Sequence, residues 1–123
     1  MIGGLIVGHK KFGESILDAV RSIAGDFEHL ISISNEGLSS DELAAMIRNA
    51  LAELNVGEVI LFVDLFGGSC WRAAKMAKSG NNRIITGVNL PMILSFLHKR
   101  ESLSFDALSE VLDTDGKRGI TNE

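Results

Sequence analysis

The stretch LIVGHKKFG, residues 5–13, decides the fold of this chain. An apolar run ends at Gly8, a histidine follows, and a helical pattern then begins. A short apolar run that ends at glycine is typical of a buried strand leading into a loop. In an open α/β sheet, ligands bind beyond the carboxyl ends of the strands, where His9 is expected. Because imidazole titrates near neutral pH, His9 is a candidate nucleophile or base; the alternative is a loop histidine without a chemical role.

Composition limits the classes of protein to which the chain can belong. Its 123 residues, 46% of them hydrophobic, predict one domain over residues 1–123 with a sizeable core. The net charge of -4 argues against a nucleic-acid binder. A single cysteine, Cys70, excludes an intramolecular disulfide and a cysteine-rich metal site, and we expect no metal or cofactor. No apolar run is long enough to cross a bilayer, and no basic segment precedes the first apolar residues, so we expect a cytoplasmic protein without a signal peptide.

Short apolar runs alternate with helical patterns along the chain. Strands are predicted at residues 2–7, 29–34, 59–63 and 83–88. Helices are predicted at residues 12–24, 39–54, 70–78, 91–99 and 105–112, and residues 116–121 are expected to form a final strand or a tail. Ser39 and Glu42 have the spacing of a capping box at the start of one helix. This alternation predicts an α/β fold with a mainly parallel sheet.

The second informative stretch is DLFGGS, residues 64–69, which follows the most apolar predicted strand. Asp64 is therefore expected at the carboxyl edge of the sheet. Gly67, Gly68 and Ser69 lead into a helix, where close backbone approach and free amide donors suit a phosphate group. The alternative is purely structural, with Ser69 as the cap of the helix and the two glycines as its turn.

These two stretches meet if the strand order is 2-1-3-4, because the sheet's switch point then lies between the first and third strands. His9 and Asp64 would face each other across that crevice. A carboxylate that accepts the Nδ1 proton of imidazole fixes the tautomer and leaves the Nε2 lone pair directed outward. An anion on Nε2 would then point at the amides of Gly67, Gly68 and Ser69. Such a site can receive and release a phosphoryl group without a metal.

Three ordered motifs, LIVGH (5–9), LFVDLFGGS (61–69) and GVNLPM (87–92), resemble the IIA domain of the mannose-family sugar phosphotransferase system. The resemblance extends over essentially the whole chain. It implies a three-layer fold in which helices cover both faces of a four-stranded parallel sheet. It also implies a homodimer completed by an exchanged C-terminal strand, and a transiently phosphorylated histidine. That histidine corresponds to His9, and the aspartate that orients it corresponds to Asp64.

The resemblance also implies partners. Phosphate would arrive from the phosphocarrier protein HPr and leave to a IIB domain, with the membrane reached only indirectly through IIC and IID transporter subunits. Because the sequence ends without a linker or a IIB domain, the acceptor is expected to be a separate IIB protein. A regulatory phospho-dimer would use the same site, and the sequence does not indicate which sugar is transported. A response-regulator receiver, with Asp64 phosphorylated, would need acidic Mg²⁺ ligands where Gly8 and His9 stand.

Several residues in or next to these motifs allow two interpretations each. Lys10 and Lys11 would favour an incoming phosphate, although loop lysines are usually just solvated. Cys70 is expected to be a small packing residue rather than a reactive thiol. Phe66 and Trp71 are either core residues or aromatic anchors for a partner at the rim of the site.

Overall fold

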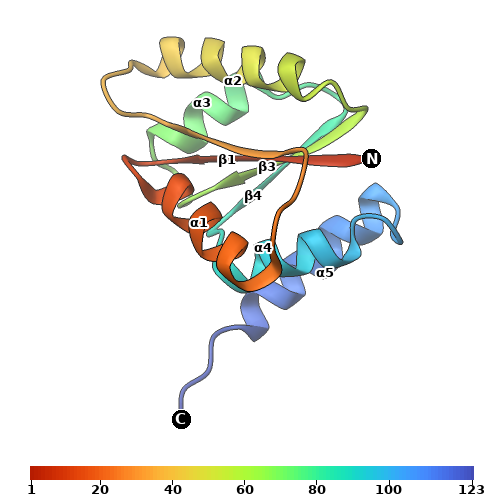
Figure 1. The fold of residues 1–123 in the computed structure, drawn as a ribbon. Helices are drawn as coiled ribbons and strands as arrows, with labels where there is room; N and C mark the ends of the chain where they lie inside the picture. Colours follow the sequence, from red (N-terminus) through yellow and green to blue (C-terminus); the bar gives the residue numbers. More distant parts are fainter.

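A parallel sheet lies between two layers of helices in the computed structural model, which describes residues 1–123 (Figure 1). The strands are β1 (Ile2–Gly8), β2 (Leu30–Ser34), β3 (Glu58–Val63) and β4 (Asn82–Thr86). The helices are α1 (Phe12–Ala24), α2 (Ser40–Leu54), α3 (Ser69–Ala77), α4 (Leu90–Lys99) and α5 (Phe105–Arg118). The sheet has four strands, all paired in parallel, in the order β2-β1-β3-β4. The predicted fold class and strand order are therefore confirmed.

The two central strands are buried on both faces because helices cover each face of the sheet. Leu61 and Val63 of β3 contribute to a core with α2 and α3. Ile60 and Phe62, which point to the other face, belong to a core with α1, α4 and α5. In this second core the rings of Phe62 and Phe96 meet edge to face, with centroids 5.2 Å apart. The absence of alternating polar residues in the predicted strand 59–63 follows from this double burial.

Local sequence signals set most helix boundaries. At the start of α2 the Ser39 hydroxyl accepts a hydrogen bond from the Glu42 amide at 3.1 Å, and Glu42 Oε1 accepts one from the Ser39 amide at 2.9 Å. The predicted capping box is thus confirmed. These hydrogen bonds hold the pKa of the Glu42 carboxyl below its ordinary value. Gly25 ends α1 as predicted, with a φ of 84° that favours glycine.

The C-terminal segment differs from the prediction. Residues 116–118 are the last turn of α5, and residues 119–123 form no strand. Gly116 does not stop the helix because it packs against α4: a Cβ there would lie 2.7 Å from Met92 Cε, and the Gly116 carbonyl accepts a hydrogen bond from Asn89 Nδ2 at 2.9 Å. The end of the chain projects away from the fold, with Ile120 76% exposed (Figure 1). The expected exchanged strand is therefore not supported.

The connections after β1 and β3 leave the sheet on opposite faces, as the sequence predicted. The helix after β1, α1, packs on one face of the sheet, whereas the helix after β3, α3, packs on the opposite face (Figure 1). Because β1 and β3 are neighbours, the loops that follow them start side by side at the carboxyl edge, which is the topological switch point of the sheet. None of the five helices combines the length and apolarity that a bilayer crossing requires.

Candidate functional site

The backbone of the central strands brings His9 and Asp64 together. In the parallel register Val7 lies beside Val63, so both chains leave the sheet at the same edge. The Asp64 amide continues the ladder by donating a hydrogen bond to the Val7 carbonyl at 3.2 Å. Asp64 is thereby fixed at the end of β3, directly beneath the loop that begins at His9.

The Asp64 carboxylate binds both the backbone and the side chain of His9. Its Oδ2 atom accepts hydrogen bonds from the His9 amide at 2.9 Å and from His9 Nδ1 at 2.6 Å. Its Oδ1 atom accepts one from the Leu65 amide at 2.9 Å. Since an ionised carboxylate can only accept, the proton of the neutral imidazole lies on Nδ1 and the lone pair on Nε2. The Asp64 side chain is 9% exposed and that of His9 46%, so the carboxylate is sheltered while the imidazole remains accessible.

The N-terminus of α3 adjoins the imidazole. Gly68 rather than Ser69 is the capping residue, and no side chain caps this helix, so Ser69 is its first residue. This corrects the structural alternative in which Ser69 was the cap. The amides of the first helical turn have no partner within the helix and carry the positive end of its dipole. A Cβ on Gly68 would lie only 3.7 Å from His9 Cε1, so the start of α3 lies within van der Waals contact of the imidazole ring.

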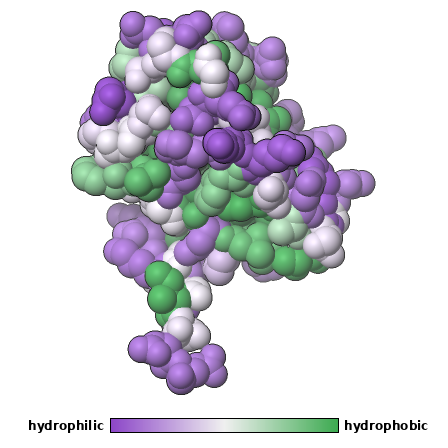
Figure 2. All heavy atoms as spheres, turned by 90° about the vertical axis from the view of Figure 1, so that its left-hand side faces the viewer, coloured by the Kyte–Doolittle hydropathy of each residue, from purple (hydrophilic) through white to green (hydrophobic).

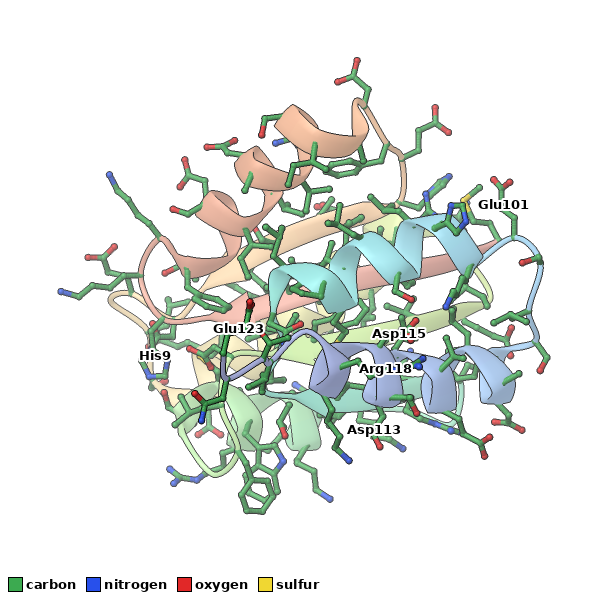
Figure 3. All side chains as sticks on the ribbon, turned by 90° about the horizontal axis from the view of Figure 1, so that it is seen from below. His9, Glu101, Asp113, Asp115, Arg118 and Glu123 are labelled. Carbon is green, nitrogen blue, oxygen red and sulfur yellow. The ribbon has the colours of Figure 1, made fainter.

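Gly67 makes the turn into this helix in a conformation with φ of 89°, which residues with a side chain rarely adopt. The predicted residues His9, Asp64, Gly67, Gly68 and Ser69 therefore lie on two neighbouring loops at one edge of the sheet. Figure 2 looks onto that edge, where hydrophilic and hydrophobic areas lie side by side, and Figure 3 labels His9 at one end of the molecule.

Asn35 is a member of this site that the sequence reasoning missed. It follows β2 directly, and its side chain lies between the other two loops. Oδ1 accepts a hydrogen bond from the Lys10 amide, and Nδ2 donates one to Ser69 Oγ, both at 3.3 Å. The available signal was its position, because β2 ends at the same edge of the sheet as β1.

Cys70 is fully buried beneath the imidazole, with Sγ 3.7 Å from His9 Nδ1. Burial, followed by the nearby charge of Asp64, raises the pKa of its thiol to about 11. The thiol is therefore protonated at neutral pH, in agreement with a packing role rather than a nucleophilic one.

The donor atoms of His9, Asp64 and Cys70 converge, all within 4.8 Å of one another. Two ligands of a tetrahedral zinc ion at ordinary bond lengths would lie about 3.3 Å apart. His9 Nδ1 and Asp64 Oδ2 are 2.6 Å apart, which is a hydrogen-bond distance. The Nδ1–Oδ2 contact therefore fits a hydrogen bond better than two ligands of one zinc ion.

Aromatic and basic side chains surround the site. Phe66 is 73% exposed and packs on the half-buried Trp71 with ring centroids 4.9 Å apart, so Phe66 belongs to the rim rather than to the core. Lys75 Nζ lies 5.7 Å from the Trp71 ring. Lys10 and Lys11 are exposed and form no ion pair. Both lysines therefore carry exposed positive charges in the loop that begins at His9.

Comparison with known proteins identifies the family. Residues 3–112 match the family described as "PTS system fructose IIA component", EIIA-man. The chain belongs to this family. It is 32% identical over 114 residues to the fructose-specific EIIA component of Bacillus subtilis, covering 88% of this chain and 77% of the relative. It is 31% identical over 114 residues to the phosphotransferase enzyme IIA component YadI of Escherichia coli, covering 89% of this chain and 78% of the relative.

Solved structures share the fold of this EIIA protein. The EIIA component of Streptococcus agalactiae superposes with a TM-score of 0.91 at 24% identity, covering 99% of this chain and 97% of that one. The mannose/sorbose-specific IIA subunit of Enterococcus faecalis gives a TM-score of 0.84 at 23% identity, with 98% and 93% covered. Membership of the family makes the chain a component of the sugar phosphotransferase system, and hence a phosphotransferase.

The Cys70 environment predicts a pH dependence of stability. The thiol pKa rises from its ordinary value of 9.0 to about 11 in the folded protein. The folded state therefore keeps this proton to higher pH than the unfolded state, and its stabilising effect is lost as pH rises from 9 towards 11. The urea midpoint of the wild type should fall more steeply over this range than that of Cys70→Ala. Parallel curves for the two proteins would contradict this account.

Proposed function

We propose that this EIIA protein carries a phosphoryl group on Nε2 of His9. The hydrogen bond between His9 Nδ1 and Asp64 Oδ2 is the observation that carries the proposal, because it leaves the Nε2 lone pair free and directed away from the carboxylate. The 46% exposure of the His9 side chain allows a partner protein to bring a phosphoryl group to this atom. We also propose that residues 1–123 act as one EIIA domain.

The transfer is a displacement at phosphorus. The Nε2 lone pair forms a P–N bond as the bond between phosphorus and the donor's histidine nitrogen breaks, and the departing nitrogen keeps that electron pair. The phosphorylated ring gains positive character while Nδ1 keeps its proton. The Asp64 carboxylate stabilises that charge, and its two hydrogen bonds to His9 prevent the ring from turning. In a second displacement, a nucleophile of the next acceptor attacks phosphorus, and the P–N bond to His9 breaks with its electron pair left on Nε2.

The amides at the start of α3 support the same role. Gly68 and Ser69 lie where the helix dipole favours negative charge, and the uncapped first turn leaves donors for phosphoryl oxygens. Gly67 gives the loop the backbone conformation that turns these donors towards His9. Together with Asp64, they allow transfer without a metal ion.

The donor we propose is the phosphocarrier protein HPr, and the acceptor is a IIB protein that passes the group on for sugar uptake. The membrane is then reached only through IIC and IID subunits. The relatives named fructose-specific and sorbose-specific differ in the sugar that their names print, at 32% and 25% identity to this chain. A regulatory phospho-dimer would use the same His9 chemistry, and neighbouring IIB, IIC and IID genes would favour the transport role.

The acceptor assignment is tested by phosphorylation in vitro. With phosphoenolpyruvate, enzyme I and HPr, the wild type should take up label that is acid-labile and alkali-stable. His9→Ala should take up none, because its nucleophilic nitrogen is gone. His98→Ala, which removes an exposed imidazole in the last turn of α4, is the matched control and should label normally. Full labelling of His9→Ala would show that His9 is not the phosphoryl acceptor.

The orienting role of Asp64 is tested by Asp64→Asn. The substitution removes a charge-assisted hydrogen bond of about 1.5–3 kcal/mol. Phosphoryl transfer should therefore slow by roughly ten- to a hundredfold if the whole loss appears in the barrier. Asp113→Asn, on the exposed surface of α5, should transfer at the wild-type rate. The rates are measured by rapid quenching, and an Asp64→Asn protein as fast as the wild type would contradict the role.

We further propose that the protein is a homodimer. Both β2 and β4 are edge strands, whose unpaired amides and carbonyls are ready to pair with a second chain. Sedimentation equilibrium at micromolar concentration should give twice the chain mass of 13.2 kDa. A monomer mass under these conditions would overturn the proposal while leaving the His9 chemistry intact.

A further inference from the structure

Asn35 connects the two loops that form the site. Its backbone is held on both sides: the amide donates to the Gly8 carbonyl at 3.1 Å, and the carbonyl accepts from the Leu38 amide at 3.1 Å. Its side chain reaches Lys10 in the loop after β1 and Ser69 at the start of α3. One half-buried amide thus bridges the residue that follows His9 and the first residue of α3.

Chemistry fixes which way this amide faces. The Lys10 backbone N–H can only donate, so the atom beside it must be the acceptor Oδ1. The donor Nδ2 must then face Ser69. Lys10 has a φ of 49°, a conformation uncommon for a residue with a side chain, and the hydrogen bond to Oδ1 helps to hold it there. The path of the His9 loop therefore depends partly on Asn35.

The same orientation decides what the Ser69 hydroxyl can do. Because Ser69 Oγ accepts a hydrogen from Nδ2, that side of the oxygen is occupied and its own hydrogen is left to donate elsewhere. Ser69 is the first residue of α3 and makes no capping hydrogen bond with its side chain. Its hydroxyl hydrogen, which also lies near the Cys70 thiol, can thus be donated to a phosphoryl oxygen on the neighbouring His9.

We infer that Asn35 is a positioning residue for phosphoryl transfer: it holds the His9 loop against the start of α3 and directs the Ser69 hydroxyl as a donor to the phosphoryl group. This inference rests on the proposed role of His9. A neutral amide suits the position, because it offers one acceptor and one donor without placing a negative charge beside the phosphate. A carboxylate of the same shape would keep the acceptor, lose the donor and repel the phosphoryl group.

Single-turnover phosphorylation by phospho-HPr tests this, with the rate constant at saturation measured separately from the half-saturating HPr concentration. Asn35→Asp should lower the rate constant roughly tenfold or more, and Asn35→Ala and Ser69→Ala roughly three- to tenfold each. The half-saturating concentration should stay unchanged, because Asn35 acts on the transfer step and not on docking. Asn49→Asp, an exposed asparagine on α2, is the control for the added charge and should match the wild type.

A double substitution separates positioning from general loss of stability. If Asn35 acts through Ser69, the variant Asn35→Ala with Ser69→Ala should be no slower than the slower single variant. Urea unfolding of each variant verifies that the fold is kept, and Ser69→Ala supplies the decisive rate if an Asn35 variant does not fold. Asn35→Asp within twofold of the wild type, or multiplicative losses in the double variant, would overturn this inference alone. A wild type that takes up no label would instead overturn the proposed function and this inference together.

Discussion

The site depends on the parallel pairing of β1 and β3. Pairing Val7 with Val63 makes both strands end at one edge of the sheet, so the residues that follow them meet although they are 55 positions apart in sequence. The 2.6 Å contact between His9 Nδ1 and Asp64 Oδ2 is the direct consequence. Both strands are buried on their two faces, and a shift in their register would move apolar side chains out of both cores. The same packing that stabilises the fold therefore fixes the geometry of the site.

The surroundings of His9 treat the imidazole and the neighbouring thiol differently. Cys70 Sγ lies 3.7 Å from His9 Nδ1, and a thiolate there would compete for an electrophile. Burial and the charge of Asp64 keep the thiol protonated at neutral pH. The same carboxylate accepts the Nδ1 proton of His9 and so leaves the Nε2 lone pair free. Burial, with a smaller contribution from Asp64, thus keeps the sulfur protonated, while Asp64 orients the imidazole.

Local patterns predicted most elements because their causes are local. The capping box at Ser39 and the terminal glycine of α1 worked because each signal acts within a few residues of the boundary that it sets. The prediction of a strand or tail from residue 116 failed for residues 116–118, because a close contact with Met92 and a hydrogen bond from Asn89 keep Gly116 in the helix. Those contacts come from α4 and its cap, which are too far away in sequence for a local pattern around Gly116 to reveal them.

The sequence by itself determined the elements, the strand order that its motifs implied, and the pair of loops that carry His9 and Asp64, because hydrophobic period and loop residues are written along the chain. Tertiary structure decided that Ser69 is the first residue of α3 and not its cap, and that Asn35 joins the two loops. Asn35 is a single polar residue after an edge strand, and no local sequence pattern around it indicates a role. Its partners are set by where three separate loops meet, and that depends on the packing of the whole sheet.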